Sequence, residues 1–248
     1  HSTFHWFGII GIAYSLILMF ALRENPAHNI KKTNIPINNT EKKISLFSGL
    51  SVLFSTWAFW IILFYFAAPS LPGWATKNWL PTLFSETLNI PMSEAGPIST
   101  ITIAVSSFIG VIVGGILSDR WVQKNIRGRV YTGAIGLGMT IPALMLLGFG
   151  ESFMAVVGAG LLFGIGFGIF DANNMPILCQ FISAKYRGTA YGIMNMTGVF
   201  AGAAVTEQLG KWTDGGNLGI GFALLSIVVL VALLLQVYFL RPRTDNME

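Results

Sequence analysis

Residues 114–129, Gly-Gly-Ile-Leu-Ser-Asp-Arg-Trp-Val-Gln-Lys-Asn-Ile-Arg-Gly-Arg (GGILSDRWVQKNIRGR), concentrate charge in a chain that has little of it. One acid and four bases fall between Asp119 and Arg129, whereas only 10% of the whole chain is charged. Residues 95–118 lead into this stretch without a charged side chain, and another apolar run follows it. A short basic connector between two long apolar runs is typical of a loop that joins two membrane-spanning helices.

The composition of the chain is that of a membrane protein. Hydrophobic residues make up 53% of its 248 residues and the mean hydropathy is +0.65. Only 10% of the residues are charged, whereas about 25% are charged in soluble domains. Residues 44–76, 95–118 and 215–240 contain no charged side chain, and roughly 18 such residues are enough for a helix to cross a bilayer. We therefore expect an integral membrane protein whose surroundings are the lipid bilayer.

Seven apolar segments are long enough to be membrane spans. β-Barrel strands would be about ten residues long with alternating polarity, and no such segment occurs in the sequence, so the predicted fold is all-α with seven transmembrane helices. The predicted spans are residues 4–22, 47–69, 97–117, 130–148, 153–182, 188–206 and 216–240. Glycines at four-residue spacing favour close helix packing, although a chain with 28 glycines also produces such pairs by chance; the pairs are Gly110/Gly114, Gly160/Gly164 and Gly164/Gly168.

Lysine and arginine fall almost entirely in alternate connectors, which predicts the orientation of the chain. Only Lys77 and Lys211 fall on one side of the membrane. Because cytoplasmic loops are rich in these residues, the side with thirteen bases is predicted to be cytoplasmic, with the amino end outside and the carboxyl tail inside. This sorting accounts for the pI of about 9.3 without a nucleic-acid partner. The thirteen bases are Arg23, Lys31, Lys32, Lys42, Lys43, Arg120, Lys124, Arg127, Arg129, Lys185, Arg187, Arg241 and Arg243.

The domain organisation is predicted from the first connector. The chain opens with His1 and enters an apolar span without the basic region of a signal peptide. Residues 23–46 are rich in Asn, Lys and Pro, as a linker between two halves would be. We expect residues 1–22 to be the last helix of a missing amino-terminal bundle, residues 23–46 to be a cytoplasmic linker, and residues 47–248 to form one six-helix bundle.

The opening stretch resembles the signature loop of the major facilitator superfamily, Gly-x-x-x-Asp-Arg followed by a basic cluster. In that family the loop joins the second and third helices of each six-helix half on the cytoplasmic side, which is the predicted place of residues 114–129. The resemblance implies helices 6–12 of a twelve-helix transporter in the cytoplasmic (inner) membrane of a bacterium. Its implied partners are a small-molecule substrate and the missing amino-terminal half, with no cofactor beyond a coupling ion, H+ or Na+.

Gly115, Asp119, Arg120 and Arg129 form a predicted conformational latch within this loop. Gly115 would allow close packing beside a neighbouring helix, and Asp119 lies at a helix carboxyl end, where the macrodipole disfavours an anion. An arginine or the amino end of another helix would stabilise this carboxylate in one conformation and release it in the other, as alternating access requires. The alternative is that the bases only fix topology and meet anionic lipid.

Two further segments narrow the resemblance. Residues 78–82 (NWLPT) resemble a segment of organic-anion and sugar-phosphate symporters and antiporters. Residues 187–190 (RGTA) with 192–195 (GIMN) resemble a helix junction of the anion:cation symporters, which carry hexuronates, sialic acid and other sugar acids. The sequence departs from related patterns at Gly73, where sugar-phosphate antiporters have an arginine, and at residues 206–208, where the symporters usually have a proline. The resemblance implies cation-coupled uptake of an organic anion such as a sugar acid; a carrier of neutral sugars or other small solutes is the alternative.

Asp171 is the one acid well inside a predicted span. An ionisable group in hydrocarbon costs on the order of 2.5–3.5 kcal/mol, so it normally faces a cavity or a partner. Gly164, Gly166 and Gly168 precede it and Pro176 follows, which predicts a bent or broken helix whose freed backbone groups suit ligand binding. Three roles are open to Asp171: proton carrier, acceptor for sugar hydroxyls, or a structural acid held by a base.

Five uncharged side chains complete the candidate substrate site. Asn173, Asn174 and Asn195 each offer two donors and an acceptor, which suit the hydroxyls of a sugar acid, and Asn195 matches a ligand-contacting position of the symporter pattern. Helix–helix hydrogen bonding is the alternative for all three. Trp60 and Tyr65 could stack on a sugar ring or simply fill the core.

Enzyme chemistry has little support in the sequence. It contains no HExxH or CxxC pattern, no phosphate-binding loop, and no cluster of residues that predicts a metal site. A seven-helix receptor or photoreceptor fits the number of spans, but residues 216–240 lack the buried lysine that a retinal protein needs, and receptors lack the Gly-x-x-x-Asp-Arg loop. The sequence therefore favours a transporter.

Overall fold

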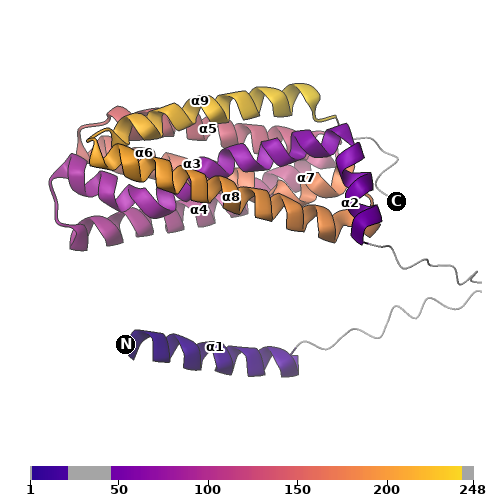
Figure 1. Cartoon of the computed structure of the whole chain (residues 1–248), viewed down its shortest axis with the longest axis horizontal. Helices are drawn as coiled ribbons and strands as arrows, with labels where there is room; N and C mark the ends of the chain where they lie inside the picture. Colours follow the sequence, from indigo (N-terminus) through magenta and orange to yellow (C-terminus); the bar gives the residue numbers. More distant parts are fainter. Residues whose placement is uncertain (1, 22–45, 242–248) are drawn as a thin grey trace, which may run out of the picture. The chain divides into compact units, whose positions relative to one another are not determined.

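The computed structural model describes residues 2–21 and 46–241, and within these ranges the chain consists of helices and short connections without any strand (Figure 1). It divides into two compact units, His1–Lys43 and Ile44–Glu248. The first unit contains the apolar helix α1 (Ser2–Ala21). The predicted linker, apart from its last residue, and six of the predicted cytoplasmic bases lie outside the described residues; these bases are Arg23, Lys31, Lys32, Lys42, Lys43 and Arg243.

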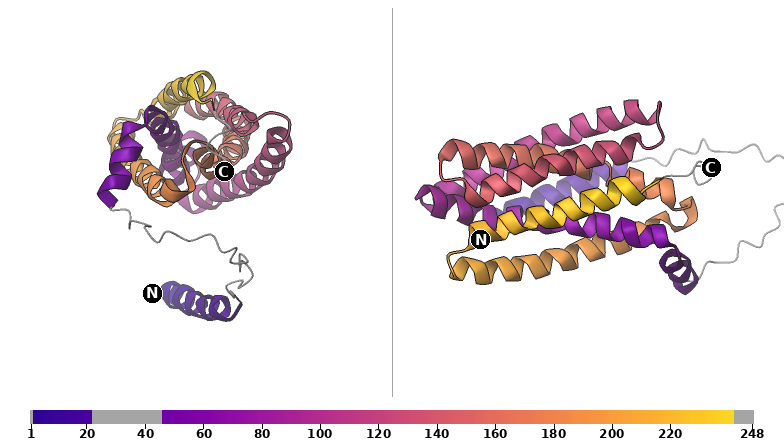
Figure 2. Two further views of the ribbon diagram at one scale, coloured as in Figure 1. Left: turned by 90° about the vertical axis from the view of Figure 1, so that its right-hand side faces the viewer. Right: turned by 90° about the horizontal axis from the view of Figure 1, so that it is seen from above.

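The second unit is a bundle of helices that run alternately up and down (Figures 1 and 2). The predicted all-α fold is confirmed. The elements are α2 (Leu46–Ser55), α3 (Trp57–Leu88), α4 (Met92–Val122), α5 (Gly128–Phe149), α6 (Phe153–Asp171), α7 (Asn174–Phe181), the 3-10 turn η1 (Ala184–Tyr186), α8 (Arg187–Asp214) and α9 (Leu218–Phe239).

One end of this bundle, called here the basic end, holds α2, the α4–α5 connection, the α7–α8 connection and the end of α9 (Figure 1). Seven of the nine described Lys and Arg residues of the bundle lie there: Arg120, Lys124, Arg127, Arg129, Lys185, Arg187 and Arg241. Lys211 lies near the opposite end, in the last turn of α8. The sequence pattern thus corresponds to a real concentration of charge at one end.

Six segments of the described chain are long and apolar enough to cross a membrane: α1, α3, α4, α5, the α6–α7 pair and α9. The seventh predicted span, residues 188–206, lies in α8 and is not among them. Its buried residues recur every three or four positions, from Ala190 to Leu209, and this face packs on α3. The rest of α8 carries polar side chains such as Asn195 and Glu207, which lower its hydropathy.

The structure corrects the predicted end of the second span. The prediction ended it at residue 69, but α3 continues through Pro69, Pro72 and Pro81 to Leu88. Neighbouring helices and side chains compensate for the backbone hydrogen bonds that prolines remove, so prolines are tolerated in membrane helices. As a consequence, Lys77 lies within a helix of the bundle and not in an external connector.

Glycines bring α4 and α6 into backbone contact. A Cβ atom on Gly110 would collide with the carbonyl oxygen of Ile165, and one on Gly168 would collide with that of Ser107. The predicted role of the glycine pairs is therefore confirmed for these positions. Small residues let helix backbones approach closely where no hydrophobic effect drives helices together.

We expect Gly110→Ala to destabilise the bundle, because the added methyl group has no room beside the backbone of α6. Overpacking of this kind costs about 1–3 kcal/mol. Gly138→Ala is the matched control, since a Cβ atom there would meet no atom within 4 Å and alanine favours the helix. Thermal unfolding in detergent measures both variants, and equal melting temperatures for Gly110→Ala and the unmodified protein would contradict the assignment.

Candidate functional site

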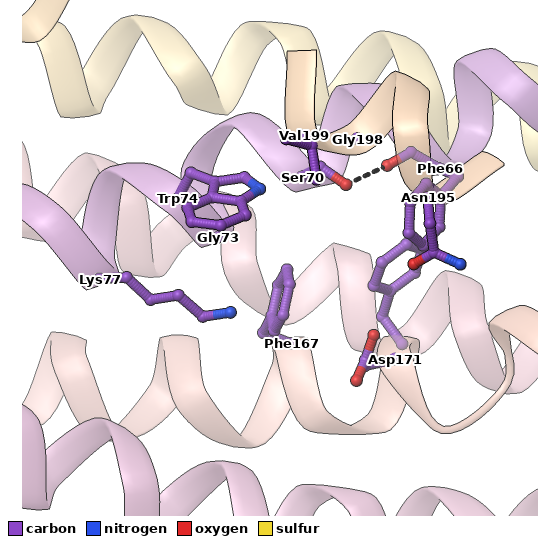
Figure 3. A pocket seen from close by; sticks show the side chains of 11 residues that line it. Phe66, Ser70, Gly73, Trp74, Lys77, Phe167, Asp171, Asn195, Gly198 and Val199 are labelled. Carbon is purple, nitrogen blue, oxygen red and sulfur yellow. Dashed lines mark hydrogen bonds between the residues drawn. The ribbon is translucent and has the colours of Figure 1, made fainter. Parts of the chain in front are cut away.

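A cavity of about 190 Å³, called here the central cavity, lies among α3, α6 and α8 (Figure 3). Four of its eleven lining residues are aromatic, and its polar groups come from all three helices. The aromatic residues are Phe66, Trp74, Phe167 and Phe170; the polar ones are Ser70, Lys77, Asp171 and Asn195. A concave, mostly apolar site with a few convergent polar groups is typical of a small-molecule binding site.

Helical periodicity explains why α3 contributes most of the lining. Its cavity residues fall at positions 66, 70, 73, 74 and 77, at intervals of one, three or four residues, so they share one face of the helix. The Lys77 ammonium lies 5.2 Å from the centroid of the Trp74 ring, within the range of a cation–π interaction. The side chain of Lys77 is thereby held beside the cavity (Figure 3).

Asp171 reaches the cavity because the helix ends there. α6 ends at Asp171 and α7 begins at Asn174, which confirms the predicted break in this span. The Asn174 side-chain amide donates a hydrogen bond of 3.0 Å to the Asp171 carboxylate. This contact joins the two helix segments across the interruption and orients the carboxylate.

Lys77 and Asp171 place opposite charges on one cavity. Figure 3 shows both side chains beside the same space, Lys77 from α3 and Asp171 from α6. The ion pairs among the described residues are Asp119–Arg129 and Glu207–Lys211, so these two groups are not paired with each other. The sequence predicted that Lys77 lies outside the membrane, so Lys77 was not among the predicted site residues. Its position three residues after Trp74 was the feature that could have indicated a shared helix face.

Asn195 also lines the central cavity, so two of the predicted substrate residues, Asn195 and Asp171, are brought together. The Asn195 amide donates a hydrogen bond of 2.9 Å to the carbonyl oxygen of Tyr191, one turn earlier in α8. Its own side-chain oxygen accepts no hydrogen bond from the described residues. That oxygen is available to a ligand.

Asn173 and Asn174 lie beside the helix break rather than on the cavity lining. The Asn173 side chain is fully buried and donates a hydrogen bond of 2.8 Å to the carbonyl oxygen of Ile169. The Asn173 amide therefore supplies a hydrogen-bond donor to one carbonyl group at the end of α6. Asn174, also buried, reaches the cavity only through its bond to Asp171.

Tyr65 and Trp60 are both absent from the lining of the central cavity, so their stacking on a sugar ring stays a prediction. Tyr65 is buried and packs edge-on against Phe170, with ring centroids 5.2 Å apart. Trp60 is half exposed on the outer surface, where its indole N–H donates to the carbonyl oxygen of Phe54 at 2.9 Å. Helix rotation directs Tyr65 into the core and Trp60 to the outer surface.

Of the four predicted latch residues, only Asp119 and Arg129 contact each other in the structure. Asp119 accepts a hydrogen bond of 3.2 Å from Arg129 in the first turn of α5, so the carboxylate does face an arginine. Arg120 is exposed and pairs with none of the described residues. Gly115 does not pack against a described helix, because a Cβ atom there would meet nothing within 4 Å; Gly114 makes the close contact instead, against Ile169 of α6.

The NWLPT segment ties α3 to α8 near the cavity. Asn78 donates a hydrogen bond of 2.9 Å to the Thr206 hydroxyl, and the Trp79 indole donates one of 3.1 Å to the Thr206 carbonyl oxygen. These two bonds hold together the helices that carry Lys77 and Asn195.

The chain matches known proteins over most of its length. The model of the Major Facilitator Superfamily matches residues 1–206. A probable chloroplastic anion transporter 3 of Oryza sativa subsp. japonica is 25% identical over 234 residues, which cover 89% of this chain and 45% of that protein. The citrate-proton symporter of Klebsiella pneumoniae is 22% identical over 204 residues, which cover 79% and 42%.

Solved structures show the same fold. The crystal structure of a D-xylose-proton symporter superposes with a TM-score of 0.53 at 17% identity, covering 81% of this chain and 50% of that one. The chain spans about half the length of the curated relatives that it matches.

A double-mutant cycle tests the contact across the helix break. Hydrogen bonds to a charged group contribute about 1.5–3 kcal/mol, so we expect Asn174→Ala and Asp171→Ala each to lower the free energy of unfolding. The double variant should lose less than the sum of the two, since both changes remove the same contact. Unfolding in a mixed-detergent titration measures the cycle. Additivity within about 0.5 kcal/mol would contradict the contact.

Proposed function

Since the chain belongs to the Major Facilitator Superfamily and spans the membrane several times, we propose that it forms half of a secondary transporter for a small organic anion. The observation that carries this proposal is the group of Lys77, Asp171 and Asn195 around one aromatic-walled cavity. Each comes from a different helix, so the affinity for a ligand that contacts all three depends on how the helices are arranged. Differential contact of this kind is what a conformational cycle requires.

The charge of Lys77 supports an anionic substrate. A lysine at membrane depth is costly unless it faces a cavity or a partner, and no described acid forms an ion pair with it. A substrate carboxylate would form charge-assisted hydrogen bonds with the Lys77 ammonium. The names of two relatives, an anion transporter and a citrate-proton symporter, support the same substrate class.

The remaining polar groups favour an acid that also carries hydroxyl groups. The Asn195 oxygen and the Asp171 carboxylate both accept hydrogen bonds and line the cavity near Lys77. A sugar acid, such as a hexuronate or sialic acid, offers a carboxylate at one end and hydroxyl donors along the rest. The aromatic walls suit the apolar faces of its ring.

Asp171 is the candidate for coupling transport to a cation. In the proposed cycle it binds H+ or Na+ together with the substrate and releases both on the other side. Its position at the end of α6, bonded to Asn174 of α7, would let the state of the carboxylate influence the geometry of the break. The role of a purely structural acid makes a different prediction, given below.

The proposed orientation places the basic end in the cytoplasm of a bacterium, because positive residues favour that side of the inner membrane. The partner would be an amino-terminal half that forms the other wall of the central cavity. Asp119 and Arg129 would act as a latch that holds one conformation, through their observed contact. Transport then follows from alternating exposure of the central cavity.

Uptake assays on the full-length protein test the substrate class. We expect uptake of hexuronates or sialic acid in preference to neutral sugars. Lys77→Gln should raise the half-saturating concentration of the anion roughly ten- to 150-fold, since a charge-assisted hydrogen bond contributes about 1.5–3 kcal/mol. Lys211→Gln is the matched control, because Lys211 is exposed and paired with Glu207. Preferential uptake of neutral sugars, unchanged in Lys77→Gln, would instead support the neutral-sugar carrier.

A second pair of assays tests the role of Asp171. If the carboxylate carries the coupling proton, Asp171→Asn should abolish accumulation driven by a proton gradient and spare exchange of labelled for unlabelled substrate, because exchange needs no net proton movement. The two rates are measured in the same proteoliposomes. Equal losses of accumulation and exchange, together with a lower melting temperature, would assign Asp171 a structural role.

A further inference from the structure

A second cavity of about 490 Å³, called here the basic-end cavity, lies between the ends of α4 and α7 and the starts of α5 and α8. It is separate in its lining from the central cavity, with no residue in common. Two arginines line it, Arg129 from α5 and Arg187 from α8, together with Cys179 and Gln180 of α7. No carboxylate is among its lining residues.

Both guanidinium groups have hydrogen-bond donors to spare. Arg187 uses its Nε and one Nη2 proton on the carbonyl oxygens of Ile182 and Cys179, at 3.1 and 3.0 Å. Arg129 uses one Nη2 proton on Asp119, at 3.2 Å. A guanidinium has five N–H donors in a planar fork, so each arginine retains several donors that no described residue accepts.

The site is held in place before any ligand arrives. The bonds to Ile182 and Cys179 fix Arg187 against the end of α7. Gln180 is 5% exposed and donates a hydrogen bond of 3.1 Å to the carbonyl oxygen of Ile126, which ties the α4–α5 connection to α7. Preorganised donors lose little freedom when they bind a ligand.

We propose that the basic-end cavity binds an oxyanion, a carboxylate or a phosphate, between Arg129 and Arg187. Two planar guanidinium groups match the geometry of such a group bidentately. The oxyanion has two possible sources, a soluble organic anion or an anionic phospholipid headgroup. The site does not depend on which substrate occupies the central cavity.

Arg129 connects this site to Asp119. The Asp119 side chain is 68% exposed, whereas that of Arg129 is 25% exposed. The carboxylate can therefore break its contact with Arg129 and be hydrated, while the guanidinium remains in the wall of the cavity. An oxyanion in the cavity and the Asp119 carboxylate therefore compete for one guanidinium. Occupancy of the cavity would weaken the Asp119–Arg129 contact.

Cys179 provides a reporter within the site, since it is partly exposed and lines the cavity. The experiment measures the rate at which N-ethylmaleimide labels Cys179, by peptide mass spectrometry, with the protein in phosphatidylcholine nanodiscs. We expect citrate at constant ionic strength to slow labelling at least fivefold in a saturable manner. Nanodiscs with phosphatidylglycerol form the second arm. Slow labelling there without citrate would identify a lipid headgroup as the source of the oxyanion.

Variants separate specific binding from general screening. Arg129→Gln and Arg187→Gln should each raise the protecting concentration about tenfold or more, because each removes charge-assisted hydrogen bonds. Asp119→Asn should lower it, since Arg129 is released. Lys124→Gln, an exposed base outside the lining, should leave it unchanged. Because Arg187 also bonds two carbonyl groups, Arg129→Gln decides the matter if Arg187→Gln does not fold.

The proposal is overturned by either of two results. One is an unchanged labelling rate with both citrate and phosphatidylglycerol. The other is equal protection in the unmodified protein and in Arg129→Gln. Neither result bears on transport through the central cavity, which the uptake assays with Lys77→Gln address independently.

Discussion

The packing of α6 between α4 and α5 is the constraint on which the rest of the structure depends. Glycines occupy both contacts: Gly168 lies against the backbone of α4, and Gly166 lies against Gly136 of α5. Helices in a bilayer gain no hydrophobic free energy from association, so close contact and dispersion must hold them together. A methyl group at any of these three positions would meet backbone atoms. Tight packing therefore fixes α6 up to its last residue, Asp171.

The helix is interrupted directly after the tightly packed α6. Irregular backbone within a membrane is tolerated only where it is buried in protein or lines a cavity, and both conditions hold here. Asn173 is buried and bonds the carbonyl oxygen of Ile169, while Asp171 faces the central cavity. The short helix α7 has eight residues, and hydrogen bonds tie its end to Arg187 and to the α4–α5 connection. The break thus joins the Asp171 carboxylate to a helix that lines the basic-end cavity.

The two cavities lie along this one broken helix and differ in charge. The central cavity combines Lys77 with Asp171, whereas the lining of the basic-end cavity has two arginines and no acid. Met175, which lines the basic-end cavity, is four residues from Asp171. Any movement of α7 would alter both sites together, since α7 supplies the partner of Asp171 and the wall around Cys179.

The sequence by itself determined the fold class, the family and the approximate place of the helices along the chain. Uncharged runs of this length indicate helices, since barrel strands are only about ten residues long. The Gly-x-x-x-Asp-Arg loop resembles the second connector of a six-helix half in this family. It also identified Asp171 and Asn195, because polar groups are rare in such runs and their presence alone indicates a role. These features depend on composition and local spacing, which a single sequence displays.

Only the tertiary structure decided which side chains meet. Lys77 lines the central cavity because α3 continues beyond residue 69, where the sequence predicted the end of this span. Tyr65 and Trp60 lie outside the lining of the central cavity, and Gly114, rather than the predicted Gly115, makes the close contact with α6. In a helix that is apolar on every side, hydrophobic periodicity does not indicate its rotation about its own axis. That rotation is set by the packing of neighbouring helices, which is why it requires the folded structure.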